Sequence, residues 1–339
     1  MKKFRVLVLM HQDLMPPEKL NGLDWKQATW RTEYNVIQTL KALGHDVFPL
    51  GVLSDLGVIR YAVDTFKPHI AFNLLEEFDG VAVFDQNVVS YLELLKLGYT
   101  GCGPRGLMIA RDKALTKKIL TFHRIDTPKF IVLEKNHKIQ KPKNLNFPLI
   151  IKSLTEESST GISQASIVRD EGKFLERVKF IHEKVGTDCI AESFIEGREL
   201  YVSIIGNSKL TVFPIWEMVF KSTPEDMEKI ATSKVKINPE YRKKYGIDTQ
   251  EAKDLSPEMI RKIQHVCKRA FKLLDLEGYA RMDLRLTPDG KVFIIEANPN
   301  PDISKDEDFA YSAKESGLSY KDLISKILTL GYSKKPDHF

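Results

Sequence analysis

The stretch RMDLRLTPDGKVFIIEANPNP, residues 281–301, places two short apolar segments on either side of a turn. The turn is Pro-Asp-Gly, so the two segments predict a β-hairpin. Asp283 lies in its first strand, and Glu296 and Asn298 lie in its second. Because a buried carboxylate without a partner is costly, these side chains predict a cation site. Sparse oxygen ligands suit Mg²⁺ that also binds phosphates. A surface hairpin with ordinary solvated charges is the alternative.

The composition is that of an ordinary soluble globular protein. The 339 residues are 42% hydrophobic and 29% charged, enough for two or three domains. The net charge of +5 is small and interleaved, so we expect no nucleic-acid partner. Cys102, Cys189 and Cys267 fit neither metal spacing nor a disulfide framework. Without a signal peptide or a membrane-length apolar run, we expect a cytoplasmic protein with no membrane partner.

The first hundred residues alternate between strand and helix patterns. The apolar run Phe4–Met10 predicts a parallel strand buried on both faces, and Trp30–Leu43 has helical spacing. Further strands are expected at 46–50 and 69–75, around a polar helix. This order predicts a doubly wound sheet. No GxGxxG pattern follows the first strand, so we expect no dinucleotide there.

The rest of the chain predicts a central unit and an α+β C-terminal unit. The expected boundaries are 1–105, 106–190 and 191–339. The elements and segments expected after residue 105 are a helix over 112–123, strands over 129–133, 147–152, 188–195 and 199–205, the segment 210–218, a helix over 257–274, the hairpin and a helix over 320–330. Between them, 220–254 is predicted to be a long charged loop, and loops of this kind are often active-site lids.

Two further segments carry groups suited to a nucleotide. Lys152 closes a strand, and the hydroxylated residues that follow it up to Gly161 offer backbone N–H groups that can fold over phosphates. From Glu192 to Glu199, two carboxylates flank apolar residues, an arrangement suited to an adenine amino group, the ring edge and ribose hydroxyls. Taken alone, a surface turn explains the first segment and an edge strand explains the second.

Taken together and in this order, the motifs resemble the ATP-grasp superfamily and, within it, the D-alanine–D-alanine ligase branch. The shared motifs are Tyr99–Pro104, Asp112-Lys113 with Lys117, Lys152 with 158–161, Glu192–Ile195 with Glu199, and 281–283 with 296–298. The resemblance covers nearly the whole chain. It implies an α/β and α+β fold, with an N-terminal Rossmann-like domain followed by a two-part ATP-grasp domain that holds ATP between two sheets.

The resemblance also implies an activity and its cofactors. The expected enzyme is an ATP-dependent carboxylate–amine ligase that forms a peptide-like bond through an acylphosphate. It would use ATP and two Mg²⁺ ions, with Mn²⁺ as a possible substitute, act on a small-molecule carboxylate and a small-molecule amine, and form a homodimer.

By the same resemblance, individual residues acquire roles. Asp283, Glu296 and Asn298 would ligate the Mg²⁺ ions, and Arg281 would stabilise the oxyanion of the tetrahedral intermediate. Lys234 would meet the γ-phosphate, with Lys236 as its near competitor. The residues expected to bind ATP are Lys113, Lys152, Glu157, Ser158, Ser159, Glu192, Phe194, Ile195, Glu199, Lys234 and Ile295.

Three segments depart from the D-alanine ligase pattern, and the departures bear on the identity of the substrate. Residues 10–17 and an insertion up to Trp30 replace a Gly-Gly-x-Ser-x-Glu segment, and 72–80 replaces Asn-x-x-His-Gly. Residues 298–307 replace a Ser/Gly-rich turn that binds a carboxylate, and acidic side chains there would repel one. We therefore expect a cationic or larger amine substrate. The candidate contacts are Glu76, Glu77, Asp79, Asn300, Asp302 and Glu307. A solvated acidic loop is the alternative.

Three other functions stay open at this point. The chain could be a true D-alanine–D-alanine ligase of cell-wall synthesis, or a related ligase with another acceptor, such as a glutamate-adding or peptide-tailoring enzyme. It could also be an ATP-binding regulatory protein without ligase chemistry. Arg281 together with three metal ligands disfavours the last function, because a protein that only binds ATP need not keep an oxyanion partner.

Overall fold

The computed structural model describes residues 2–20, 22–141, 143–155, 161–225 and 227–334, and three β-sheets organise them. The N-terminal sheet is parallel, in the order β2 (Asp46–Val52), β1 (Arg5–His11), β3 (Ile70–Asn73). Between its strands run α1 (Arg31–Ala42) and α2 (Gly57–Phe66), and α3 (Asp85–Leu94) follows β3. The predicted β-α-β-α-β order is confirmed.

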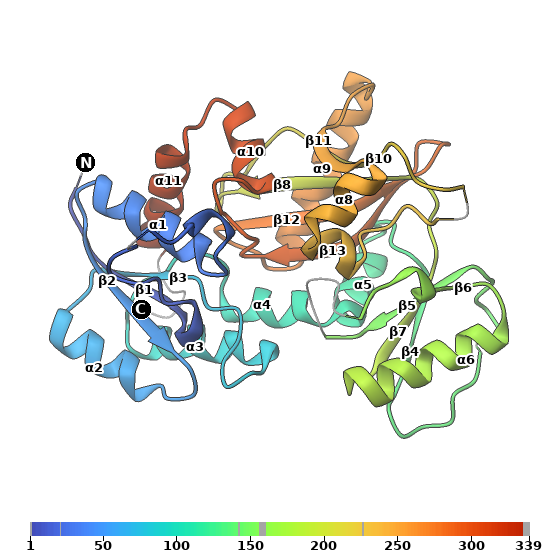
Figure 1. Cartoon of the computed structure of the whole chain (residues 1–339), viewed down its shortest axis with the longest axis horizontal. Helices are drawn as coiled ribbons and strands as arrows, with labels where there is room; N and C mark the ends of the chain where they lie inside the picture. Colours follow the sequence, from blue (N-terminus) through green and yellow to red (C-terminus); the bar gives the residue numbers. More distant parts are fainter. Residues whose placement is uncertain (1, 21, 142, 156–160, 226, 335–339) are drawn as a thin grey trace.

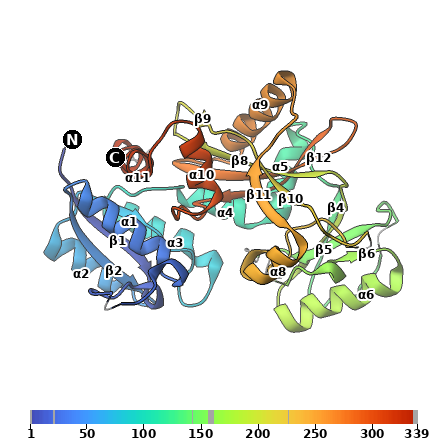
Figure 2. The same cartoon turned by 45° about the horizontal axis from the view of Figure 1, so that its top comes forward.

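The strand β1 is buried on both faces, as its continuous apolar run predicts. Leu7 and Leu9 pack in one hydrophobic core with Ile59 of α2. The alternate side chains of β1 pack in a second core, together with Val36 of α1 and Leu323 of α11 (Tyr320–Ser333). The last helix therefore covers one face of the first sheet, and it lies beside the N-terminal unit in both views (Figures 1 and 2).

The central sheet is antiparallel and carries its own small core. Its strands run in the order β4 (Phe130–Leu133), β7 (Cys189–Ser193), β5 (Leu149–Ser153), β6 (Ile167–Val168). The helix α6 (Glu171–Phe180) packs against it through Phe174 and Val178, both fully buried. Among the described residues, this core contains side chains of the central unit only, whereas the other two sheets share their cores with each other.

The C-terminal sheet is the largest of the three. Its order is β11 (Ile247–Glu251), β10 (Trp216–Phe220), β8 (Arg198–Ile205), β12 (Tyr279–Leu286), β13 (Val292–Pro299), with β9 (Thr211–Val212) paired to β8. The helices α4 (Pro104–Arg111), α5 (Lys113–Phe122) and α9 (Pro257–Leu273) contribute to the core on one face of this sheet. The hairpin predicted around residues 288–290 is confirmed as β12 and β13.

The segment 220–254 is not a structureless loop, so that prediction is wrong. It contains α7 (Ser233–Ile237), α8 (Pro239–Tyr245) and β11. Polar side chains cap the N-termini of both helices: Thr232 accepts a hydrogen bond from the N–H of Val235, and Asn238 accepts one from the N–H of Tyr241. A helix not anticipated from the sequence, α10 (Asp308–Glu315), follows the hairpin. None of the described helices combines the length and hydropathy that crossing a bilayer requires.

Candidate active site

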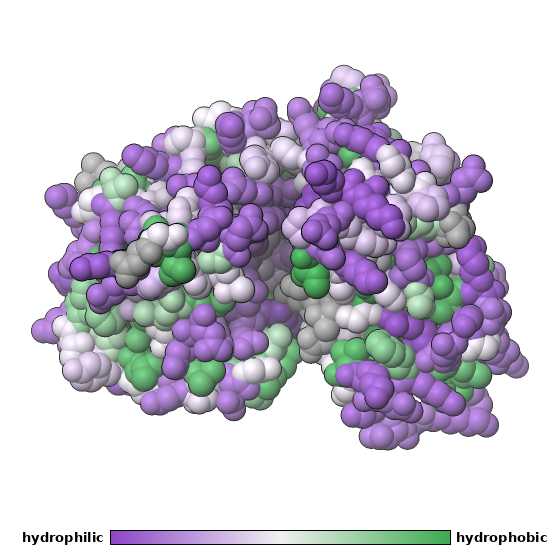
Figure 3. Space-filling view, in the orientation of Figure 1, coloured by the Kyte–Doolittle hydropathy of each residue, from purple (hydrophilic) through white to green (hydrophobic). Residues whose placement is uncertain are grey.

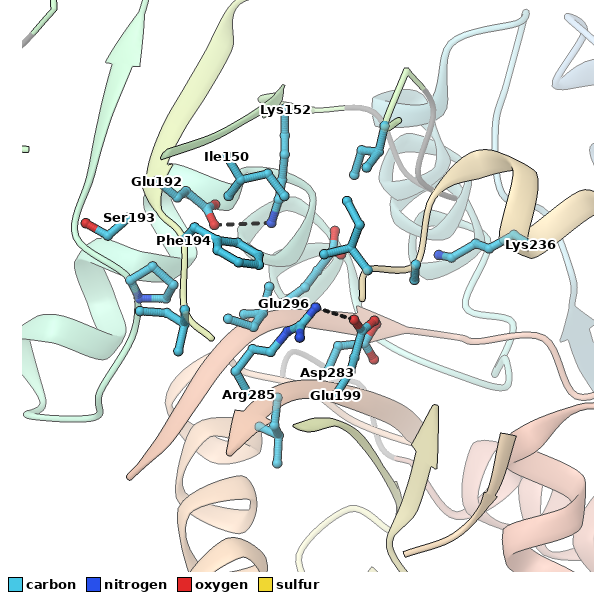
Figure 4. Close-up of a pocket in the computed structure, with 17 residues that line it drawn as sticks. Ile150, Lys152, Glu192, Ser193, Phe194, Glu199, Lys236, Asp283, Arg285 and Glu296 are labelled. Atoms are coloured by element: carbon cyan, nitrogen blue, oxygen red, sulfur yellow. Dashed lines mark hydrogen bonds and ion pairs between the residues drawn. The ribbon is translucent and has the colours of Figure 1, made fainter. Parts of the chain in front are cut away.

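A cavity lies where the central sheet faces the C-terminal sheet (Figure 4). The central sheet contributes Lys152 and Glu192 to this inter-sheet cavity, and the C-terminal sheet contributes Asp283 and Glu296. The residues that line it are Pro128, Ile150, Lys152, Ile162, Glu192, Ser193, Phe194, Ile195, Glu199, Ile230, Ala231, Lys236, Asp283, Leu284, Arg285, Ile295 and Glu296. Segments separated by more than a hundred residues thus share one pocket.

The pairing of β12 with β13 brings the predicted metal ligands together. Asp283 lies directly opposite Glu296, and Arg281 lies opposite Asn298. Cβ atoms of opposite residues are about 5 Å apart. The register then shifts, so that Ile295 has no opposite residue and forms a β-bulge. The bulge lets the adjacent Ile295 and Glu296 both line the inter-sheet cavity.

Cationic side chains hold both carboxylates of the hairpin. Arg281 donates two hydrogen bonds to Asp283, at 2.7 and 3.0 Å. Burial raises the pKa of Asp283, although the charge of Arg281 opposes this. The Nζ atom of Lys113, at the start of α5, lies 3.2 Å from Glu296. Burial opposes ionisation of Glu296 too, but Lys113 and Lys152 outweigh it and lower its pKa to about 2. Glu296 is therefore a carboxylate at neutral pH.

A buried carboxylate with two lysine partners forms another wall of the cavity. Lys152 Nζ lies 3.1 Å from Glu192 Oε2, and Lys117 Nζ lies 3.3 Å from Glu192 Oε1. Lys117 has no exposed surface and also donates to the carbonyl of Ile295 at 2.8 Å. Burial opposes the ionisation of Glu192, yet the two lysines lower its pKa. Lys117 thus links the strand β7 of the central sheet to β13 of the C-terminal sheet.

Glu199 also lines the inter-sheet cavity, and it accepts hydrogen bonds on both oxygens. Arg285 donates to one oxygen at 2.6 Å and Tyr201 to the other at 2.8 Å. Because each carboxylate oxygen has two acceptor positions, Glu199 keeps capacity for a further donor. Arg285 also donates to the carbonyl of Gly197, which fixes the segment that follows β7.

Of the two candidate lysines on α7, the structure places one at the cavity. Lys236 lines the inter-sheet cavity. Burial is the largest effect on the pKa of Glu296 and raises it; Lys113, Lys152 and then Lys236 lower it, in decreasing order of effect. Figure 4 shows the ammonium group of Lys236 directed toward Asp283 and Glu296. Lys234 is exposed and is not among the lining residues.

A second cavity, here called the central cavity, opens on the other side of Arg281. Arg281, Asn298 and Lys236 line it beside Glu76 and Asp302. The residues that line it are Leu75, Glu76, Asp85, Leu107, Arg111, Tyr201, Met218, Val235, Lys236, Arg242, Asp248, Thr249, Arg281, Asn298, Pro299, Asn300, Pro301, Asp302, Asp306, Glu307, Asp308 and Tyr311. The surface between the N-terminal unit and the side of the molecule that carries α6 and α8 is hollowed, with a largely hydrophilic rim (Figure 3).

The structure places the candidate substrate residues in three different settings. Glu76, Asn300, Asp302 and Glu307 line the central cavity. Glu77 lies 3.2 Å from His11 Nε2 and lines a third cavity. Asp79 is exposed on a turn with φ 55°, its N–H donates to the carbonyl of Leu53, and it is not among the lining residues of these cavities. Three predicted ATP contacts, Glu157, Ser158 and Ser159, lie outside the described residues.

The donor set of the hairpin fits a divalent cation that prefers oxygen ligands. Asp283 and Glu296 supply carboxylates from directly opposite positions. The buried Nδ2 atom of Asn298 has no hydrogen-bond partner among the described residues, so the protein does not fix this amide, which can turn its oxygen toward a cation. Two acidic ligands and an amide leave coordination positions for water and phosphate, as Mg²⁺ requires.

Two buried cations of the site were absent from the predicted set, although the sequence carries a signal for each. Lys117 lies four residues after Lys113, on the same face of α5, and is fully buried. Arg285 lies two residues after Asp283, so the period of a strand places it on the cavity face.

Comparisons with known proteins agree with this architecture. The family model described as D-ala D-ala ligase C-terminus matches residues 119–329. A D-alanine–D-alanine ligase of Pelagibacter ubique is 30% identical over 273 residues, which cover 78% of this chain and 82% of that protein. A protein of Sinorhizobium fredii described as uncharacterized is 26% identical over 322 residues, 91% of this chain and 89% of its own length.

A solved structure supports the fold over almost the full length. The D-alanine–D-alanine ligase of Bacillus anthracis, crystallised with ATP, superposes with a TM-score of 0.75 at 22% identity, covering 97% of each chain. The predicted combination of an N-terminal α/β domain with a two-part ATP-grasp domain is therefore confirmed. The match of the family model and the identity to these relatives lead to one conclusion: this chain belongs to the D-alanine–D-alanine ligase family, and it is an ATP-dependent ligase that forms carbon–nitrogen bonds.

Proposed function

We propose that the enzyme joins a carboxylic acid to an amine other than D-alanine through an acylphosphate. The observation that carries this proposal is the Arg281–Asp283 ion pair. Asp283 lines the inter-sheet cavity and Arg281 lines the central cavity, so the pair spans the boundary between them. A phosphoryl donor in the first cavity and a carboxylate in the second would meet there.

The inter-sheet cavity suits ATP. Lys152 and Lys236 line it and supply positive charge for the phosphates. Lys113 adds a further positive charge through its ion pair with Glu296. We assign the γ-phosphate contact to Lys236 in preference to Lys234, because Lys236 lines both cavities. The residues proposed to hold adenine and ribose are Glu192, Phe194, Ile195, Glu199 and Ile295. Glu157, Ser158 and Ser159 stay predicted phosphate contacts.

Asp283, Glu296 and Asn298 would hold Mg²⁺, which, when bound, neutralises charge on the transferring phosphoryl group. Before the cation binds, bidentate hydrogen bonds from Arg281 hold the carboxylate of Asp283 in place. The low pKa of Glu296, which Lys113 and Lys152 maintain against its burial, keeps this ligand ionised without the cation.

The chemistry follows from the position of Arg281. A carboxylate oxygen attacks the γ-phosphorus of ATP, ADP leaves, and the resulting acylphosphate is an electrophile. The amine then attacks the acyl carbon, loses a proton, and inorganic phosphate leaves. The guanidinium of Arg281, which lies over the ring of Tyr201 at 4.8 Å, is suited to stabilise the oxyanion formed in that attack. Because water would hydrolyse the acylphosphate, the site must close over it.

The acidic wall of the central cavity supports a substrate other than D-alanine. Asp302, Asp306 and Glu307 follow the metal strand and line the cavity beside Asn298. A free carboxylate on the incoming amine would meet these negative charges, whereas a cationic group would be attracted to them. A true D-alanine–D-alanine ligase is the alternative that the relatives' names suggest.

Phosphate release from ATP, measured with Mg²⁺ and a panel of amino acids and amines, tests the proposal. We expect turnover with acceptors other than D-alanine, and loss of turnover with every substrate in Glu296→Gln. Efficient dipeptide formation from D-alanine alone would refute the substrate assignment. ATP binding without phosphate release across the panel would favour a binding protein. Activity that survives in Glu296→Gln would exclude the proposed metal ligand.

Dimerisation stays a prediction, and sedimentation tests it.

A further inference from the structure

A third cavity, here called the Glu33 cavity, adjoins the central cavity. It lies between the ends of β1 and β3 and the turn that follows β13. The two cavities share Leu75, Glu76 and the segment 300–302, so a ligand can extend from one into the other. The residues that line it are His11, Leu14, Thr29, Thr32, Glu33, Asn73, Leu74, Leu75, Glu76, Glu77, Tyr279, Asn300, Pro301, Asp302 and Ile303.

Glu33 is the unusual residue of this cavity. It lies in the first turn of α1, is only 5% exposed, and lines the cavity. Its Oε2 atom is buried without a hydrogen-bond partner in the part of the chain that the structure describes. A buried acceptor left unpaired costs about 1–3 kcal/mol, more when charged, so this position requires a donor that the described residues do not supply.

The other polar groups of the cavity make its charge negative. Asp302 accepts a hydrogen bond from Thr32 at 2.9 Å, and Arg31 lies 3.8 Å from it. Glu77 pairs with His11, and Glu76 completes the acidic set. Neither Lys nor Arg is among the described residues that line the cavity. Burial, followed by the charges of Asp302 and Glu76, raises the pKa of Glu33 to about 7, against the effect of a backbone hydrogen bond.

Apolar surfaces flank these acids. Leu14, Leu74, Leu75 and Ile303 line the cavity together with the ring of Tyr279. A methylene chain can pack on such surfaces while a charged group at its end reaches the carboxylate, as the stems of Lys side chains do. The combination of an apolar wall and the unpaired Glu33 Oε2 favours an extended ligand that ends in a hydrogen-bond donor.

We propose that the Glu33 cavity binds the side-chain ammonium group of a basic amino acid, whose α-carbon end lies in the central cavity beside Arg281 and Asn298. The position of the reacting end rests on the proposed ligase function. Binding of the ammonium gives Glu33 its missing partner and favours its ionised form. Glu33 is thereby the residue that selects the basic substrate over a neutral one of similar shape.

Calorimetric titrations of the full-length protein with Mg²⁺ and a non-hydrolysable ATP analogue test this assignment. The ligands are lysine against norleucine and ornithine against norvaline, each as both enantiomers, so that the members of a pair differ in the terminal amino group. We expect at least one basic ligand to bind at least tenfold more tightly than its neutral counterpart. We expect Glu33→Gln to bring this preference within twofold and Glu18→Gln, a carboxylate exposed outside the cavity, to retain it.

Unchanged affinity for the ATP analogue shows that Glu33→Gln is folded. No preference for a basic ligand in the wild type, or a preference that survives in Glu33→Gln, overturns the assignment. Phosphate release, measured in parallel, separates this outcome from failure of the proposed function. A basic preference without phosphate release would leave the cavity assignment standing and refute the ligase proposal. Efficient turnover of neutral substrates alone would refute the cavity assignment and leave the ligase proposal standing.

Discussion

Arg111 and Asp85 form a buried ion pair that holds one wall of the central cavity. Arg111 Nη2 lies 2.7 Å from Asp85 Oδ2 and also donates to the carbonyl of Glu76 at 2.9 Å. Both side chains are less than a tenth exposed. Because Arg111 ends α4 immediately before Asp112 and Lys113, this pair connects the N-terminal unit to the helix that carries Lys113.

Replacing Arg111 should therefore affect both stability and substrate affinity. Arg111→Ala leaves Asp85 buried with an uncompensated charge, which costs about 3–5 kcal/mol of unfolding free energy. We also expect KM for the amine substrate to rise, since the carbonyl of Glu76 loses the hydrogen bond that Arg111 donates to it. Denaturant unfolding and steady-state kinetics measure the two effects. Arg105→Ala, on the same helix but in an exposed pair with Asp275, should cost about 1 kcal/mol or less. Equal losses in the two variants would contradict this account.

Lys117 should contribute to ATP affinity without contacting the cavity. Lys117→Met removes the ion-pair partner of Glu192 and the donor to the carbonyl of Ile295, both at the cavity wall, so we expect a fivefold or larger increase in KM for ATP. The lost hydrogen bonds to the carbonyl of Ile295 and to Thr127 should lower the unfolding free energy by about 1–3 kcal/mol. Lys118→Met removes the adjacent lysine, which is exposed, and should match the wild type. An unchanged KM for ATP in Lys117→Met would refute the connection between the sheets.

The two lysines of α7 offer a matched test. We expect Lys236→Ala to lower kcat at least tenfold, because a charge beside the transferring phosphoryl group is lost. Lys234→Ala should be nearly wild type, since Lys234 does not line either cavity. Both side chains are exposed, so thermal unfolding should change little in either variant. A larger loss of kcat in Lys234→Ala than in Lys236→Ala would instead support the prediction made from the sequence, in which Lys234 meets the γ-phosphate.

Glu33 should destabilise the free protein as the pH rises. Its pKa is raised by burial from 4.5 to about 7, so the folded state binds more protons than the unfolded state between these values. Stability that Glu33 contributes below pH 4.5 is lost as pH increases to about 7. Above pH 7, Glu33→Gln should therefore be more stable than the wild type, and Glu18→Gln should not. Urea unfolding at pH 5 and pH 8 checks the sign. A loss of stability in Glu33→Gln at pH 8 would contradict it.

The hairpin was predictable because its signals are local. Alternation, a Pro-Asp-Gly turn and acidic residues inside apolar runs are all contained in residues 279–299. The helices at 233–245 were missed because they are only five and seven residues long and carry no apolar periodicity. The start of α8 was nevertheless signalled by Asn238-Pro239, a capping residue followed by proline at the first helical position.

Glu33 could not be found from its own surroundings in the sequence. It lies within an ordinary helix, α1, and its isolation depends on residues 76 and 302, which reach it only through the packing of the C-terminal turn on the N-terminal unit. Lys117 and Arg285 were accessible from periodicity, but which carboxylate each one meets depends on how the sheets are placed.

The helix α11, which packs on the face of the first sheet formed by Val6 and Val8, also constrains how the chain folds during synthesis. The helix α1 covers part of that face, and the rest stays uncovered until a helix more than two hundred residues later has left the ribosome. The central unit, whose described core is self-contained, has no such delay. We expect the middle of the chain to acquire protease resistance first, while the amino-terminal sheet depends on chaperones until the end of translation.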